Sequence, residues 1–190
     1  EALMLDHGQG DEEAFEELVR RHHKNVLNYT FRMVQNRQIA EELTQEVFVA
    51  LVQNAKRYEP TAKFTTYLYT IASNIVSKEW SRRKRIPKIF SLSYWGWRDE
   101  DDGNPLESVG DDRENVLVAF QRGEISEAVN MALKELPEHQ REAFVLRRFQ
   151  DLSYEEIAEV AGAPIGTIKS RVARAEYALR PLLEAYREYV

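Results

Sequence analysis

Residues 152–174, LSYEEIAEVAGAPIGTIKSRVAR, most constrain how this chain can fold, because they contain the start and stop signals of two short helices. Ser153 followed by Glu156 is a capping-box pattern, in which each side chain satisfies a backbone amide of the first turn. Gly162 predicts the end of the first helix, since glycine tolerates the left-handed backbone common at that position. Pro164 suits the first turn of a second helix. The stretch therefore predicts a helix-turn-helix.

The second of these helices combines an apolar stripe with a polar outer face. Apolar residues recur three and four positions apart, which predicts a face turned toward a core: Ile165, Ile168, Val172, Ala175, Leu179 and Leu182. The residues off this stripe are short hydroxyls and long cations: Thr167, Lys169, Ser170, Arg171 and Arg174. Such groups suit base edges and phosphates, so this helix is predicted to enter the major groove of DNA. On the turn alone, a solvated helix hairpin is the competing interpretation.

Composition limits the class of protein. A chain of 190 residues with 43% hydrophobic residues can form one large or two small packed domains. It contains no cysteine, which excludes disulfides, thiolate catalysis and cysteine zinc sites. No apolar run reaches the ~18 residues of a membrane span, and a cytoplasmic location is expected. The adjacent His22 and His23 diverge by roughly 100° on a helix, so no metal site is predicted.

The net charge of −6 hides an uneven distribution of charge. Residues 61–92 contain 7 Lys/Arg and 1 Asp/Glu, whereas residues 93–140 contain 4 and 12. A nucleic-acid footprint is a local basic patch, so an acidic total does not exclude it. The sequence therefore predicts a basic segment followed by an acidic connection.

Two helices are predicted before the basic segment, over 11–35 and 39–56, from apolar residues at spacings of three and four. The buried stripe of the second is expected to contain Ile39, Leu43, Val47 and Leu51. Off this stripe lie acids and an amide together with two apolar side chains: Glu41, Glu42, Gln45, Glu46, Phe48 and Val49. An exposed aromatic among carboxylates indicates a docking surface for a basic, partly apolar partner. A solvated helix face is the competing interpretation.

A third helix is predicted over 64–85, after a loop that contains Pro60. It carries Phe64, Tyr67, Tyr69 and Trp80 next to Asn74 and several hydroxyls, and it ends in Arg82, Arg83, Lys84 and Arg85. Four cations at the C-terminal end of a helix also interact favourably with the helix dipole, so the competing interpretation is that they only stabilise the helix. Aromatics interleaved with amides and cations are, however, what unstacked bases and phosphates require. The helix is therefore a candidate site for single-stranded nucleic acid.

Helical periodicity is lost over 87–112, where glycines, prolines and the acidic run 99–102 predict a linker. Tyr94, Trp95 and Trp97 within it are expected to dock on the chain itself or on a partner. Four helices are predicted after it, from near Arg113 onward, with one over 138–149. No two-residue alternation persists, so the fold class is all-α: a domain over 1–90, an irregular acidic linker over 91–122, and a helix-turn-helix domain over 123–190.

Taken together, three motifs resemble those of the extracytoplasmic-function group of bacterial sigma factors, which keep only regions 2 and 4. AEELTQEVF (40–48) is similar to the region 2 helix that binds polymerase. FTTYLYTIASN (64–74) is similar to the segment that opens and reads the −10 element. LPE…RE (136–142), LSYEEIA (152–158) and GTIKSR (166–171) are similar to region 4. Three ordered motifs at family spacing are specific, whereas each alone is weak.

The resemblance implies a transcription initiation factor that binds core RNA polymerase through its clamp helices and flap. The docking residues would be Glu41, Glu42, Gln45, Glu46 and Phe48. The residues for the −10 element would be Thr61, Ala62, Lys63, Phe64, Tyr69 and Asn74, with Arg82, Arg83, Lys84 and Arg85 on nearby phosphates. Those for the −35 duplex would be Thr167, Lys169, Ser170, Arg171 and Arg174.

The same resemblance implies an anti-sigma partner of a kind that can be anchored in the membrane, and an acidic linker that threads a cationic channel of the polymerase. No cofactor, no small-molecule substrate and no catalytic residue are expected, because the polymerase carries out the phosphodiester chemistry. Two other classes fit parts of the sequence. A stand-alone helix-turn-helix regulator would bind its duplex without polymerase, and it usually carries an α/β receiver domain. An enzyme would need convergent residues in a pocket, whereas the acids here lie on an outer helical face.

Overall fold

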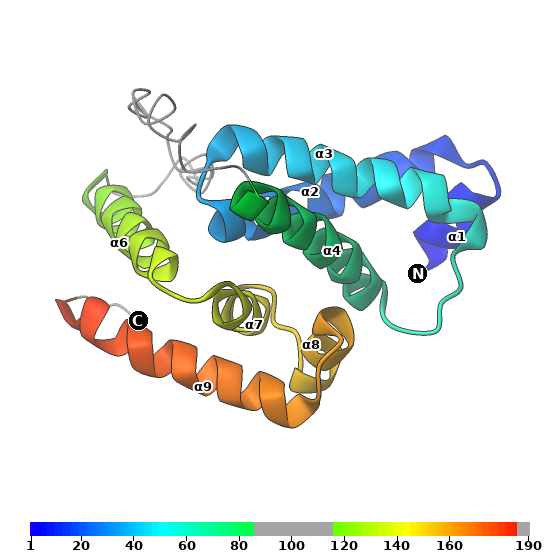
Figure 1. Cartoon of the computed structure of the whole chain (residues 1–190). Helices are drawn as coiled ribbons and strands as arrows, with labels where there is room; N and C mark the ends of the chain where they lie inside the picture. The colour runs from blue at the N-terminus through cyan, green and yellow to red at the C-terminus, as the bar shows by residue number, and fades with distance from the viewer. Residues whose placement is uncertain (86–115, 186–190) are drawn as a thin grey trace.

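In a computed structural model, which describes the backbone of residues 1–85 and 116–185, every described element of secondary structure is a helix (Figure 1). The elements in chain order are α1 (Ala2–Gly8), α2 (Glu12–Val34), α3 (Arg37–Asn54), the 3₁₀ turn η1 (Ala55–Arg57), α4 (Phe64–Arg85), α6 (Val116–Lys134), α7 (Glu138–Phe149), α8 (Tyr154–Ala161) and α9 (Ile165–Leu182). The all-α prediction is confirmed. Side chains are described for 1–85 and 124–185.

The N-terminal unit packs α2, α3 and α4 around one core, with α1 at one end (Figure 1). Capping side chains fix where the helices begin: Asp11 accepts from the amide of Ala14 at 3.1 Å, and Asn36 accepts from the amide of Ile39 at 3.0 Å. The two caps satisfy amides that a first turn otherwise leaves without a partner. Gln35, in the left-handed region at φ 54, ends α2 and turns the chain back into α3.

The helix bounds agree closely with those expected from the sequence, and α4 and α7 have the predicted limits. The predicted 39–56 helix is instead α3 from Arg37, followed by η1. Helix α1 was not predicted, because in its seven residues only Met4 is buried and no periodicity can develop. The predicted linker 91–122, with Tyr94, Trp95 and Trp97, lies largely outside the described residues; α6 begins within it at Val116.

The C-terminal unit contains α6 to α9, and its helix-turn-helix has the predicted local geometry. The hydroxyl of Ser153 accepts from the amide of Glu156 at 3.1 Å, and the Glu156 carboxylate accepts from the amide of Ser153 at 2.7 Å. Gly162 is left-handed at φ 57 and ends α8. Pro164 is the N-cap of α9 and so lies one position before the first turn. The capping box and the glycine stop are therefore confirmed.

The apolar stripe of α9 is buried in its middle and exposed at its ends. Ile168, Val172, Ala175 and Leu179 belong to the core. Ile165 and Leu182 are 39% and 47% exposed, because they lie where the neighbouring helices no longer cover the stripe. The stripe therefore holds α9 by its central part, about three turns from Ile168 to Leu179, and leaves the opposite face open.

Replacing Ser153 with alanine is expected to lower the free energy of unfolding by about 1 kcal/mol, because the first turn of α8 loses a capping acceptor. Urea unfolding followed by circular dichroism measures the change. Ser170→Ala is the matched control, since Ser170 is an exposed serine inside a helix of the same unit; its effect should stay within about 0.5 kcal/mol. Equal effects of the two substitutions would contradict a capping role for Ser153.

Candidate nucleic-acid and partner interfaces

The outer face of α3 is acidic, as predicted, but its apolar component differs from the prediction. Glu41, Glu42, Gln45 and Glu46 are all exposed. Phe48 is only 8% exposed and stacks on His23 with ring centroids 6.0 Å apart, so the prediction that it is exposed is wrong. The exposed apolar side chains are instead Val49, as predicted, and Val52, at 53% and 44%.

The error at Phe48 has a structural reason. Helix α3 packs against both α2 and α4, so its buried arc is wider than a single stripe. A second row at a spacing of four, Ala40, Thr44 and Phe48, is buried beside the predicted row. Thr44 fits there because its hydroxyl donates to the carbonyl of Ala40 at 2.7 Å. This spacing of four was the signal in the sequence that places Phe48 in the core.

The segment predicted to meet the −10 element is partly covered. Thr61, Lys63 and Asn74 are exposed, and Ala62 is half-buried. Phe64 is 5% exposed and lies in the core against His22 and Tyr58, so it anchors the start of α4. Of the aromatics predicted to stack on bases, Tyr69 is 3% exposed and Trp80 is 6% exposed. In this arrangement the face of α4 presents few free aromatic rings.

Helix α8 and the loop before it account for the cover on this segment. The hydroxyl of Tyr69 donates to the side-chain oxygen of Gln150, in the loop after α7. Burial raises the pKa of Tyr69 well above its ordinary value. Lys63 pairs with Glu156 at 2.9 Å, and the hydrogen bond between them raises the pKa of the lysine and lowers that of the glutamate. Tyr69 and Lys63, both predicted to bind the −10 element, thus contact the C-terminal unit.

The cations at the end of α4 are partly neutralised by glutamates. Glu79, the one acid of residues 61–92, accepts from Arg82 at 2.7 Å and from Arg83 at 2.8 Å. These hydrogen bonds, that from Arg82 above all, lower the pKa of Glu79 although the residue is buried. Lys84 pairs with Glu138 of α7 at 2.5 Å. Sequence reasoning missed the role of Glu79, although the spacings of three and four to the two arginines indicate it.

The outer face of α9 has the predicted character. Lys169, Ser170 and Arg174 are exposed, whereas Thr167 and Arg171 are half-buried. The ammonium of Lys169 lies 5.7 Å from the centre of the Tyr154 ring, and the hydroxyl of Ser170 donates to the carbonyl of Thr167 at 2.9 Å. The structure thus brings the five residues together on the first three turns of one helix.

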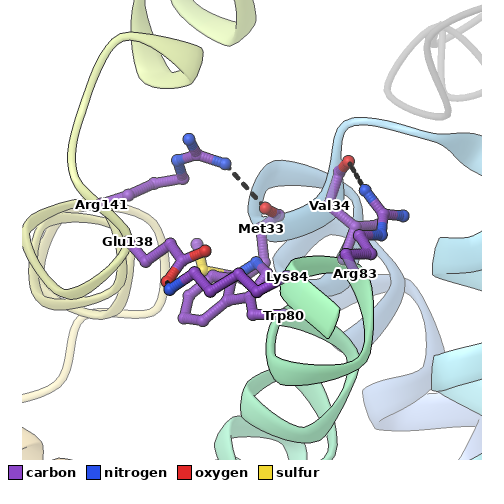
Figure 2. Close-up of a pocket in the computed structure, with 7 residues that line it drawn as sticks. All are labelled: Met33, Val34, Trp80, Arg83, Lys84, Glu138 and Arg141. Atoms are coloured by element: carbon purple, nitrogen blue, oxygen red, sulfur yellow. Dashed lines mark hydrogen bonds and ion pairs between the residues drawn. The ribbon is translucent and has the colours of Figure 1, made fainter. Parts of the chain in front are cut away.

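Between the two units lies a shallow cavity of about 300 Å³ (Figure 2). Its lining residues are Met33, Val34, Trp80, Arg83, Lys84, Glu138 and Arg141. Arg141 donates to the carbonyl of Met33 at 2.7 Å, and Arg83 donates to that of Val34 at 3.4 Å, so two arginines cap the C-terminal end of α2. No spacing in the sequence could indicate these contacts, because they join residues 108 and 49 positions apart.

Two further properties of the described residues bear on the type of site. No group of three His, Asp or Glu side chains within residues 1–85 and 124–185 is placed to hold a metal ion. Across the part of the chain that the structure describes, no helix has the length and apolar character needed to cross a bilayer.

Comparison with known families and proteins assigns the two units. Residues 18–86 match the family model of sigma-70 region 2, and residues 126–179 match that of sigma-70 region 4. The two matches together cover more than half of the chain and therefore define a sigma-70-type factor. The solved structure of CnrH in complex with the cytosolic domain of CnrY has a similar fold, with a TM-score of 0.62, 20% identity, and coverage of 97% of this chain and 96% of that one. So does RpoE in complex with the anti-sigma factor NepR from Bartonella quintana, with a TM-score of 0.62, 24% identity, and coverage of 90% and 96%.

Similarity in sequence narrows the class further. The chain is 32% identical over 179 residues to RNA polymerase sigma-H factor of Pseudomonas aeruginosa, over 92% of this chain and 91% of that protein. It is 31% identical over 187 residues to the ECF RNA polymerase sigma-E factor of Haemophilus influenzae, over 96% of each. The chain belongs to the extracytoplasmic-function group of RNA polymerase sigma factors. It is a transcription initiation factor that binds core RNA polymerase and directs it to specific promoters, and not a stand-alone regulator.

Proposed function

We propose that three surfaces divide the recognition of polymerase and promoter, with a domain over 1–90 and a second over 123–190. The outer face of α3 docks on core polymerase. Residues 61–74 and the cations at the end of α4 take the −10 element, and the outer face of α9 reads or clamps the −35 duplex. The observation that supports this division most directly is the separation of charge: exposed carboxylates with Val49 and Val52 lie on α3, and exposed cations lie on α9.

The chemistry of each surface fits its proposed ligand. Carboxylates around exposed valines suit a basic, partly apolar protein surface. Hydroxyls and cations on the first turns of α9 suit base edges and phosphates in a major groove. Melting DNA costs a few kcal/mol of stacking energy per base-pair step. Binding an unpaired base in a pocket of the protein recovers part of this cost.

The remaining proposals follow from this role. The protein acts in the cytoplasm, where RNA polymerase acts, and it takes part in initiation without being an enzyme itself. An anti-sigma protein that masks the same surfaces is a further proposed partner. Two structures of similar fold support it: RpoE is bound to the anti-sigma factor NepR, and CnrH is bound to the cytosolic domain of CnrY.

Reconstitution with core polymerase tests the proposed function. The holoenzyme should select promoter sequences from a random library and transcribe them, whereas core polymerase alone should not, and the free chain should bind the selected duplexes weakly. If the free chain selected the same duplexes with high affinity and did not co-elute with core polymerase, the proposed division of surfaces would be wrong.

Replacing Arg171 with alanine is expected to weaken binding of the −35 duplex by about 1–3 kcal/mol and to relax specificity at one base pair, if the guanidinium reads a base in bidentate fashion. Binding of the holoenzyme to a panel of singly substituted −35 sequences measures both effects. Ser170→Ala serves as the neighbouring control that keeps every cation. Equal weakening across the panel would identify Arg171 as a phosphate contact.

A further inference from the structure

Residues 58–63 connect η1 to α4 and contain part of the surface proposed for the −10 element, so we call them the −10 loop. They form no helix, and Thr61 and Lys63 are exposed within them. The amide of Thr61 donates to the carbonyl of Glu59 at 2.8 Å. A loop without regular structure takes its shape mainly from the elements that hold its two ends. For the −10 loop these ends are η1 and the first turn of α4.

The residue at the N-cap position of α4 cannot cap the helix. The carbonyl of Lys63 accepts from the amide of Tyr67 at 3.2 Å, which makes Lys63 the N-cap residue. A lysine side chain has no acceptor atom, so it cannot satisfy an amide of the first turn. The carboxylate of Glu1 accepts from the amide of Phe64 at 3.1 Å instead, from 63 positions away in the chain. The helix dipole also favours an anion at this end.

Helix α1 holds Glu1 in this place. The backbone carbonyl of Glu1 accepts from the amides of Met4 and Leu5 at 3.0 and 3.1 Å, and Met4 is completely buried. The side chain of Glu1 does not cap α1, of which Glu1 is the N-cap residue, and turns to α4. Burial raises the pKa of Tyr58, and the Glu1 carboxylate adds to this shift, which agrees with a carboxylate beside the −10 loop.

The other end of α1 lies against η1 at close range. A Cβ atom on Gly8 would lie 2.9 Å from the carbonyl oxygen of Ala55, which is too close for real atoms, so this approach requires a glycine. Ala55 is 6% exposed and begins η1. The seven residues of α1 extend about 10 Å. Helix α1 therefore bridges η1 and the start of α4, the two ends of the −10 loop (Figure 1).

We propose that α1 is a strut that sets the shape of the −10 loop, and that Glu1 and Gly8 are positioning residues for selection of the −10 element. Glu1 fixes where the −10 loop enters α4, and Gly8 fixes how closely η1 approaches α1. The bases that the −10 loop accepts thus depend on a helix that lies outside it. The proposal rests on the proposed assignment of the −10 loop to the −10 element.

A merely stabilising role of α1 makes a different prediction. Loss of stability lowers the amount of folded protein and reduces initiation at every promoter by the same factor. A change in the shape of the −10 loop alters the preference for one −10 sequence over another, because specificity is a difference between affinities. The ratio of initiation between promoters therefore distinguishes the two roles.

Four variants probe the strut. E1A removes the acceptor, whereas E1Q keeps a side-chain oxygen that can accept from the amide of Phe64 and should rescue the function. D6A is the matched control, because Asp6 is an exposed carboxylate on the same helix. G8A places a methyl group against the carbonyl of Ala55. Alanine is the better helix former, so G8A disturbs the contact with η1 and not α1 itself.

Amide hydrogen exchange, measured by NMR on the free chain, tests the cap without DNA. In E1A the amide of Phe64 should exchange about fivefold faster, because its hydrogen bond is lost. E1Q should show a smaller change, and D6A should show none. Unchanged exchange at Phe64 in E1A would overturn the role of Glu1.

Initiation by the reconstituted holoenzyme tests selection. The promoters carry single substitutions in the −10 element and one constant −35 element, and every variant is compared at equal occupancy of core polymerase. E1A and G8A should change the ratio between promoters by at least about fivefold, whereas E1Q and D6A should stay within about twofold. An equal loss at all promoters would show that α1 only stabilises the fold.

A variant of the −10 loop itself separates this proposal from the one on which it rests. T61A/K63A should alter the preference among −10 sequences directly. If T61A/K63A alters it and neither E1A nor G8A does, the strut is wrong and the −10 surface stands. If T61A/K63A leaves the preference unchanged, the −10 loop does not read the −10 element and both proposals fail.

Discussion

Reversing two charges on the outer face of α3, Glu42→Lys together with Glu46→Lys, is expected to abolish binding to core polymerase and to leave the fold intact. Both side chains are exposed and lie one turn apart, on either side of Gln45. Four units of charge are changed at a surface proposed to meet a basic partner, and juxtaposed like charges cost several kcal/mol. Size-exclusion co-elution with core polymerase measures the loss, and circular dichroism checks the fold.

The matched control carries the same change of charge at the same spacing on another helix. Glu12→Lys with Glu16→Lys alters two exposed acids of α2 and should leave co-elution with polymerase unchanged. Undiminished co-elution of the α3 variant would remove the docking role from this face. Loss in both variants would point to net charge and not to a local surface.

Replacing Ile168 with alanine is expected to lower the free energy of unfolding by about 2–5 kcal/mol, because a fully buried side chain leaves a cavity in the core of the C-terminal unit. Ile165→Ala, three positions earlier on the same helix, is the control, because Ile165 is 39% exposed. Its cost should be below about 1 kcal/mol. Urea unfolding monitored by circular dichroism measures both values.

A second consequence of Ile168→Ala concerns DNA. The side chain anchors the helix whose outer face carries Lys169 and Arg171, so its loss should also weaken binding of the −35 duplex, although Ile168 itself is buried and cannot contact DNA. Equal unfolding free energies for the two alanine variants would show that the buried centre of the stripe does not hold α9 in place.

The sequence was sufficient to predict helices that have strong local signals. The limits of α4 and α7, the capping box at Ser153 and the stop at Gly162 all depend on interactions within four residues, and all agree with the structure. Phe48 was misplaced because its burial depends on two neighbouring helices, and a single periodic stripe describes contact with only one.

The candidate −10 site shows the limit of reasoning from residue type. Tyr69 has the chemistry to stack on a base, and nothing local distinguishes it from an exposed aromatic. Its cover comes from Gln150, 81 positions later in the chain. Likewise, the four cations at the end of α4 were expected on nearby phosphates, whereas Glu79 and Glu138 accept from three of them. Contacts between distant segments decide how much of a predicted surface is available.

The two carboxylate oxygens of Glu156 have separate partners: one accepts from the amide of Ser153, and the other pairs with Lys63. When Lys63 leaves for a phosphate, as proposed, the oxygen that caps α8 keeps its partner, so the start of the helix-turn-helix is preserved. Lys63 then exchanges the carboxylate of Glu156 for a phosphate of the nucleic acid. Binding of Lys63 to a phosphate still releases a cation condensed on the nucleic acid, and the internal ion pair with Glu156 is the interaction given up in exchange.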